Sequence, residues 1–92
     1  MSNVTVRPLD DQTFEVTVSG PAATTHTVTV QPDYAERLTG GSVPMEQLVA
    51  ASFDFLLQRE PNTSILRRFE LSVIGHYFPE YERTMRARFG SP

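Results

Sequence analysis

The sequence predicts an α+β fold: a three-stranded antiparallel meander with one main helix and two or three shorter helices packed on one face. Three observations favour this class. Three runs of alternating apolar and polar residues come first, an amphipathic helical segment follows, and shorter stretches of helical spacing end the chain. Strands that precede the helices, rather than alternate with them, are typical of α+β folds. Because the chain has 92 residues, we expect a single domain over residues 1–92.

The alternating runs cover residues 3–7, 13–19 and 24–31, and short turns separate them. Valine and phenylalanine occupy one side of these runs, and threonine occupies much of the other side. Alternation with a period of two predicts strands with one covered face, and short connections predict antiparallel neighbours. We therefore expect helices over the apolar face and two open sheet edges, where unpaired backbone groups invite another chain.

Residues 32–41 predict a short helix between the third strand and the main helix. Pro32 suits the first turn, where its missing N–H is not needed, and Gly40 suits the left-handed conformation that ends many helices. Tyr34 and Leu38 are four residues apart, so we expect both to face inward.

The main helix is predicted over residues 42–59. Apolar residues recur there three and four positions apart, which gives the helix one broad apolar face. We expect Ser42 to cap the start and Pro44 to lie in the first turn. Arg59 suits the negative end of the helix dipole, and Pro61 stops the helix.

Residues 64–88 are interpreted as two or three short helices, with a single kinked helix as the alternative. The first would carry an apolar edge after capping residues 62–64; that edge consists of Ile65, Leu66 and Phe69. Phe78-Pro79 predicts a bend, because proline disfavours helix at the residue before it. We expect residues 88–92 to fray.

The run SILRRFELSVIGHYFPEYE, residues 64–82, resembles a segment found in short uncharacterised bacterial proteins of similar length. The preceding TVTV strand and the LVAASFDFLLQRE helix are similar too, so the resemblance covers most of the chain. It implies a stand-alone bacterial domain. It implies no activity, so no functional residue follows from it.

Composition excludes several classes of site. The chain has no cysteine, which rules out disulfides and thiolate metal sites, and we expect no cofactor. It shows neither a signal-peptide pattern nor an apolar run long enough to span a membrane, so we expect a cytoplasmic protein. The net charge of −3 divides unevenly: residues 1–60 carry −5 and residues 61–92 carry +2.

The positive charge near the end of the chain is the candidate binding site of this sequence. It comes from Arg67, Arg68, Arg83, Arg86 and Arg88. Together with Tyr77, Tyr81 and Phe89 they form a mixture of cations and aromatic rings that is typical of RNA-binding surfaces. The alternative is a solvated helical face whose arginines pair with neighbouring glutamates.

The candidate residues for metal binding and for catalysis are weaker. His26 and His76 are the only histidines, and no metal site is expected, because such sites usually need three or four ligands. His26 shares strand parity with buried valines, so we expect it to bind a backbone carbonyl. The candidates for an enzyme or small-ligand site are His76, Tyr77 and Glu80, and they would require a closed pocket with a perturbed titratable group.

These observations favour a non-enzymatic protein that acts through protein–protein contact, as a homodimer or with another protein. Pairing of sheet edges is one expected route to the homodimer, and contact between the terminal helices is the other. A nucleic-acid-binding accessory domain that uses the arginine cluster is the alternative, and its affinity would fall steeply with salt. An enzyme or small-ligand binder is the second alternative.

Overall fold

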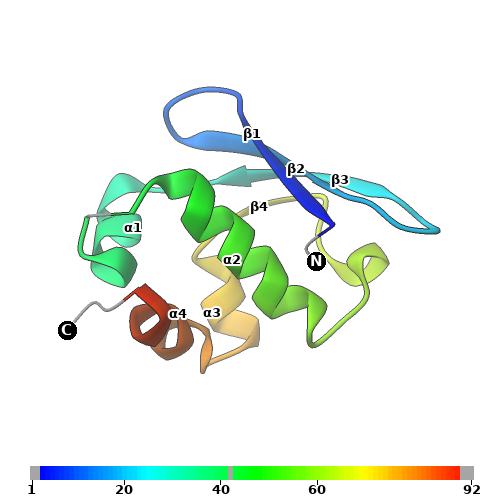
Figure 1. The fold of residues 1–92 in the computed structure, drawn as a ribbon. Coiled ribbons are helices and arrows are strands. Elements are labelled where there is room, and N and C mark those ends of the chain that lie inside the picture. Colours follow the sequence, from blue (N-terminus) through cyan, green and yellow to red (C-terminus); the bar gives the residue numbers. More distant parts are fainter. Residues whose placement is uncertain (1–2, 42, 90–92) are drawn as a thin grey trace.

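The computed structural model describes residues 3–41 and 43–89 and confirms the α+β class. Its sheet has four strands in the order β1-β2-β3-β4, and helices cover one face of the sheet (Figure 1). The bounds are Val4–Pro8 for β1, Thr13–Val18 for β2, Thr24–Thr29 for β3 and Arg68–Glu70 for β4. The antiparallel meander of the first three strands is confirmed, and β4 adds to β3 in parallel.

The alternation of the strands sorts their side chains onto two faces. Phe14, Val16 and Val28 lie on the inner face and are almost completely buried. The outer face carries polar residues, and one row across the four strands reads Arg7, Glu15, Thr27 and Arg68. One face is therefore covered and the other is solvated, as the alternation predicted.

The prediction of a helix beginning near Ile65 is wrong. Residues 62–64 form a single 3₁₀ turn, η1 (Asn62–Ser64), and Ile65 is already extended, with φ −77° and ψ 137°. The chain then runs beside β3 as β4, so the sheet has a fourth strand and β3 is not an edge. The spacing of Ile65 and Phe69 suits a helix, but both side chains are buried from an extended backbone.

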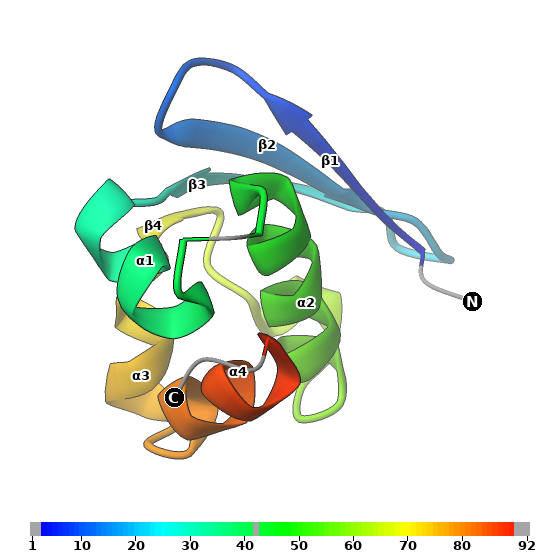
Figure 2. The same ribbon diagram turned by 60° about the vertical axis from the view of Figure 1, so that its left-hand side comes forward.

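Four helices form the second layer. They are α1 (Pro32–Thr39), α2 (Met45–Leu57), α3 (Val73–Tyr77) and α4 (Tyr81–Phe89). Figures 1 and 2 show α2 beneath β1 and β2, while α1, α3 and α4 lie beside it on the same side of the sheet. Among the described residues, no helix is long and apolar enough to cross a membrane.

The helix bounds agree with the predictions in most respects. Gly40 ends α1 with φ 75°, as its position suggested. Helix α2 is shorter than predicted at both ends, because Pro44 lies just before its first residue and the helix ends at Leu57. The predicted cap Ser42 lies outside the described residues.

The segment after β4 consists of two short helices, not of one kinked helix. The extended backbone of Phe78, with φ −131° and ψ 91°, ends α3 before Pro79. Arg88 belongs to α4, and residues 90–92 of the predicted frayed end lie outside the described residues.

Candidate interaction site

Strand β4 is an edge strand of the described sheet, and only one of its sides belongs to the β3 ladder. The backbone N–H of Thr27 donates to Arg67 O at 2.7 Å, and Leu71 N–H donates to Thr29 O at 2.9 Å. In a parallel ladder alternate residues face alternate sides, so the backbone groups of Phe69 also face β3. The N–H and C=O groups of Arg68 and Glu70 therefore face away from the sheet.

A buried histidine attaches the segment that leads into β4. The His26 side chain is fully buried on the inner face of β3, and its Nδ1 lies 2.7 Å from Leu66 O. A carbonyl only accepts, so Nδ1 carries the proton and donates. The expectation that His26 bonds a backbone carbonyl is confirmed.

The other ring nitrogen of His26 continues this hydrogen-bond chain. Nε2 lies 2.8 Å from Thr24 Oγ1, and in the tautomer that carries its proton on Nδ1 it accepts from that hydroxyl. Asn62 Nδ2 in turn donates to Thr24 Oγ1 at 2.9 Å and to Ala22 O at 2.7 Å. Each buried polar group here has a partner, so η1 and the start of β4 are bound to β3 over a separation of about forty residues.

An apolar groove of about 330 Å³ lies beside this edge. Its wall is formed by the end of α2, the segment that enters β4, and helix α3. The lining residues are Leu56, Glu60, Ser64, Ile65, Leu66, Phe69, Val73, Ile74, Tyr77 and Phe78. Leu66 and Tyr77 are 49% and 68% exposed, unusually high values for large apolar side chains in this molecule. Phe69 lies on β4 between Arg68 and Glu70, and its side chain lines the groove, so the groove adjoins the open edge. We call the groove and the edge together the β4 site.

The opposite edge of the sheet is different. Leu9 N–H donates to Thr13 O and Ser19 N–H donates to Asn3 O, which directs the backbone groups of Val4, Val6 and Pro8 away from β2. Pro8 has no N–H to offer, and α2 contacts β1 from below. The pocket near this side is wide and has a polar lining that includes Asp54, Glu60 and Arg88.

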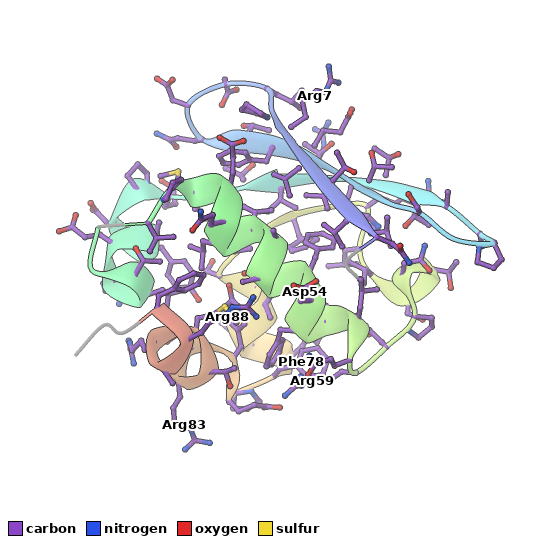
Figure 3. The ribbon with its side chains drawn as sticks, in the orientation of Figure 1. Arg7, Asp54, Arg59, Phe78, Arg83 and Arg88 are labelled. Atoms are coloured by element: carbon purple, nitrogen blue, oxygen red, sulfur yellow. The ribbon has the colours of Figure 1, made fainter. Side chains whose placement is uncertain are left out.

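The five predicted arginines lie in two different places. Arg67 and Arg68 are exposed at β4, whereas Arg83, Arg86 and Arg88 belong to α4. Figure 3 shows Arg83 pointing away from the body of the molecule and Arg88 pointing toward Asp54 on α2. The structure therefore does not gather the five side chains on one element, and on α4 the side chains of Arg83 and Arg88 point in different directions.

Two of the α4 arginines have acidic neighbours. Arg86 Nη2 lies 4.0 Å from Glu82 Oε1, and Arg88 Nη2 lies 3.9 Å from Asp54 Oδ2. Both pairs are long and largely exposed, so each is worth little energy. Their presence favours the interpretation of α4 as a solvated face with paired charges.

The residues considered for catalysis are not brought into a closed site. His76 and Tyr77 are exposed on α3, and Glu80 follows the break. The Glu80 carboxylate accepts from Arg59 Nε at 3.1 Å, and its pKa is lowered by its own backbone N–H and then by Arg59. Among residues 3–41 and 43–89, no three acidic, histidine or cysteine side chains gather as a metal site would require.

The tyrosines with perturbed acidity lie in the core, away from the groove. The Tyr81 hydroxyl is fully buried and lies 2.6 Å from Ser52 Oγ, which donates to Leu48 O at 2.7 Å. Burial raises the pKa of Tyr81. Burial also raises the pKa of Tyr34, whose hydroxyl donates to Glu82 Oε2 at 2.8 Å. These groups connect the helices, and neither lines the β4 site.

Sequence reasoning missed the β4 site because it treated residues 65–69 as helical. The run from Arg68 to Leu71 alternates charged, apolar, charged, apolar, and the two apolar residues are buried. That alternation, with Arg67 before it, was the available signal for a strand. The groove itself has no comparable sequence signature, because it depends on where α3 lies relative to η1.

The chain matches no family model, and comparison with the curated proteins and with the solved structures found nothing similar to it.

Proposed function

We propose that this protein is a non-enzymatic protein–protein interaction domain that acts as a homodimer and uses the β4 site. One observation carries the proposal: an open strand edge and an apolar groove occur side by side, on a surface that also exposes Leu66 and Tyr77. An added strand would satisfy the backbone groups of β4, and apolar side chains would be covered in the groove, which is how sheet edges bind peptides and other chains.

The free energies expected from covering the groove and pairing the strand edge are of the kind that stabilises protein–protein contacts. Complete burial of a leucine side chain contributes about 1.5–3 kcal/mol, and because Leu66 is 49% exposed, covering it contributes about half of that. Backbone hydrogen bonds add about 0.5–1.5 kcal/mol each, and together these contributions oppose the free-energy cost of association. The groove contains few polar groups, and the tyrosines with raised pKa lie outside it, so catalysis has less support.

Size-exclusion chromatography with light scattering, over a hundredfold range of concentration, tests the proposal. We expect a dimer that dissociates on dilution. Absorbance at 260 nm should be recorded too, because three Tyr and no Trp make the protein's own absorbance weak. A monomer at every concentration would overturn the homodimer. A peak that carries nucleic acid and loses it in salt would favour the arginine cluster instead.

A matched pair of leucines assigns the contact to the β4 site. Leu66 and Leu9 are 49% and 47% exposed, and Leu9 lies in the turn between β1 and β2. We expect Leu66→Asp to weaken the dimer at least tenfold, while Leu9→Asp leaves it unchanged. Equal effects of the two substitutions, or none, would exclude the groove as the contact.

A further inference from the structure

We infer that the β4 site binds the β4 site of a second copy, with the two β4 strands antiparallel and a two-fold axis at Phe69. This inference rests on the proposed function and adds the interface and its register. In this register the Arg68 of each copy lies opposite the Glu70 of the other copy, and the two Phe69 residues face each other. The result is one continuous sheet with four strands from each copy.

The backbone of β4 permits this register. An antiparallel pair exchanges both hydrogen bonds only between residues whose N–H and C=O groups face the partner strand. Those residues are Arg68 and Glu70, because the Arg67 C=O, both groups of Phe69 and the Leu71 N–H are directed toward β3. Two reciprocal pairs therefore exchange all of the outward backbone groups of Arg68 and Glu70, with the axis at the intervening Phe69.

The charges make this register self-complementary. Arg68 and Glu70 project from the outer face, where side chains of directly opposite residues are about 5 Å apart, so the dimer contains two Arg–Glu pairs. The same arrangement already exists inside the sheet: Arg7 and Glu15 are opposite each other on antiparallel strands, and Arg7 Nη2 donates to Glu15 Oε1 at 2.9 Å.

The alternative registers are unfavourable. A slip that preserves the direction of the backbone groups must move the strands by two residues. One such slip places the Arg68 residues of the two copies opposite each other, and the other does the same with the two Glu70 residues. Like charges directly opposite each other are destabilising, so β4 favours one register for its own copy.

The groove supplies the rest of the contact. A two-fold axis at the edge of a continuous sheet places the helical layers of the two copies on the same side, so the two grooves adjoin. Leu66 and Tyr77, the exposed apolar side chains of the site, are then covered by their counterparts. A strand as short as β4 alone buries far less than the roughly 800 Å² per partner of a stable interface, so the groove is required.

Charge reversal tests the register through mixing. In Arg68→Glu both pairs become Glu–Glu, and in Glu70→Arg both become Arg–Arg, so each variant alone should dimerise at least tenfold more weakly. In a mixed dimer, both pairs again join a glutamate of the Arg68→Glu copy to an arginine of the Glu70→Arg copy. We therefore expect the mixture to restore a dimer of native affinity. Arg83→Glu is the matched control, because Arg83 is an exposed arginine on α4.

An engineered disulfide measures the register directly, because the natural chain has no cysteine. Directly opposite residues have Cα atoms about 5.5 Å apart, within disulfide range, and the diagonal neighbours do not. Under mild oxidation an equal mixture of Arg68→Cys and Glu70→Cys should give the mixed dimer at least tenfold faster than either variant gives its own. Intact mass distinguishes the three products.

The outcomes separate the two proposals. If wild type is a dimer that neither charge variant weakens, and no mixed disulfide forms in excess, this interface is wrong and the dimer uses another surface. If Arg83→Glu weakens the dimer instead, the contact involves α4. A monomeric wild type overturns the proposed homodimer together with this interface. Circular dichroism of each variant shows that it is folded, so a loss of dimer is a loss of contact.

Discussion

The two edge strands of the sheet, β1 and β4, differ in how far their outward backbone groups are protected from pairing with another chain. β1 is protected in part: Pro8 removes a donor from its outer side, although the N–H and C=O groups of Val6 still face outward, and the Arg7–Glu15 pair stays within the sheet. β4 has no such proline; its outward groups remain available, and an apolar groove adjoins it. The less protected edge is therefore the one at which we propose binding.

The two edges also differ in the side-chain contacts that hold them in place. A surface ion pair supports β1, with the Arg7 side chain 65% exposed. The entry to β4 depends on the buried chain of hydrogen bonds from Asn62 through Thr24 and His26 to the Leu66 carbonyl. Buried polar groups are costly when they lose a partner, whereas exposed pairs are not. The short three-residue ladder of β4 is thus supplemented by buried polar contacts, whereas β1 relies on a five-residue ladder with β2 and on contact with α2.

The largest expected effect comes from His26→Leu, which removes the hydrogen bonds that hold the start of β4 against β3. The Leu66 carbonyl would lose its donor, and the Thr24 hydroxyl would lose its acceptor but keep the hydrogen bond from Asn62. An unsatisfied buried group costs about 1–3 kcal/mol. We expect the free energy of unfolding to fall by about 2–4 kcal/mol in urea denaturation. His76→Leu, at the exposed histidine of α3, should change it by less than about 0.5 kcal/mol. Equal effects would remove the distinction between the edges.

A rise in pH should lower the stability of the whole fold and thus affect both edges alike, because the tyrosine that responds to it lies among the helices beneath the sheet. The pKa of Tyr81 is raised by burial above its ordinary value of 10.0, so the neutral form is favoured in the folded state. Its stabilising contribution is complete below pH 10 and is lost as the pH rises above that value. For Tyr81 we expect a fall of up to about 1.4 kcal/mol per pH unit, measured by urea denaturation between about pH 10 and 12.

Tyr81→Phe is the control for this pH dependence. It should cost about 1 kcal/mol at neutral pH, since Ser52 keeps its bond to Leu48 O but loses the tyrosine. Above pH 10 the variant should lose stability less steeply than wild type, with Tyr34 responsible for the remaining slope. An unchanged slope would show that Tyr81 is not the titrating group.

Arg68→Pro would give β4 the protection that β1 already has. The Arg68 N–H faces the open side, so proline there should preserve the ladder to β3. We expect the dimer dissociation constant to rise at least tenfold, about 1.4 kcal/mol, with unfolding of the monomer changed by less. Phe69→Pro should instead disrupt the ladder. Sedimentation velocity measures the first effect and thermal melting the second; a dimer unaffected by Arg68→Pro would contradict an edge contact.

The smallest expected effect is that of Arg7→Ala at the protected edge. An exposed ion pair contributes about 0.2–1 kcal/mol, so unfolding should be easier by about 0.5 kcal/mol, and dimerisation should not change. High salt should reduce even this difference, because it screens exposed charges. A fall in the free energy of unfolding as large as that of His26→Leu would mean that the Arg7–Glu15 pair stabilises β1 as strongly as the buried hydrogen bonds stabilise β4.

The sequence predicted the secondary structure correctly where a segment fitted only one periodicity. The valine and threonine alternation predicted the meander, and the position of Gly40 predicted the end of α1. Residues 65–71 supported two interpretations, because apolar residues four apart suit a helix while Arg68 to Leu71 alternate as a strand. Long-range pairing with β3 decided between them, and no local pattern encodes that pairing.

The candidate site was accessible to sequence reasoning only in part. The histidine that binds a backbone carbonyl followed from strand parity, and the general idea of a sheet-edge contact followed from counting strands. The identity of the edge did not, because β4 was not recognised. The groove depends on the packing of α3 against the end of α2 and η1, and Leu66 and Tyr77 reveal their exposure only in three dimensions.

The wide separation of β3 and β4 along the chain has a consequence for the order of folding. Each hairpin of the meander closes a short turn, whereas β4 reaches β3 only after the intervening segment with α1 and α2 has been made; His26 and Leu66 are 40 residues apart. Closing long loops is slow and entropically costly. We expect β4 to dock late, so β3 is the exposed edge of the nascent chain. The proposed interface thus forms only in molecules that have completed folding.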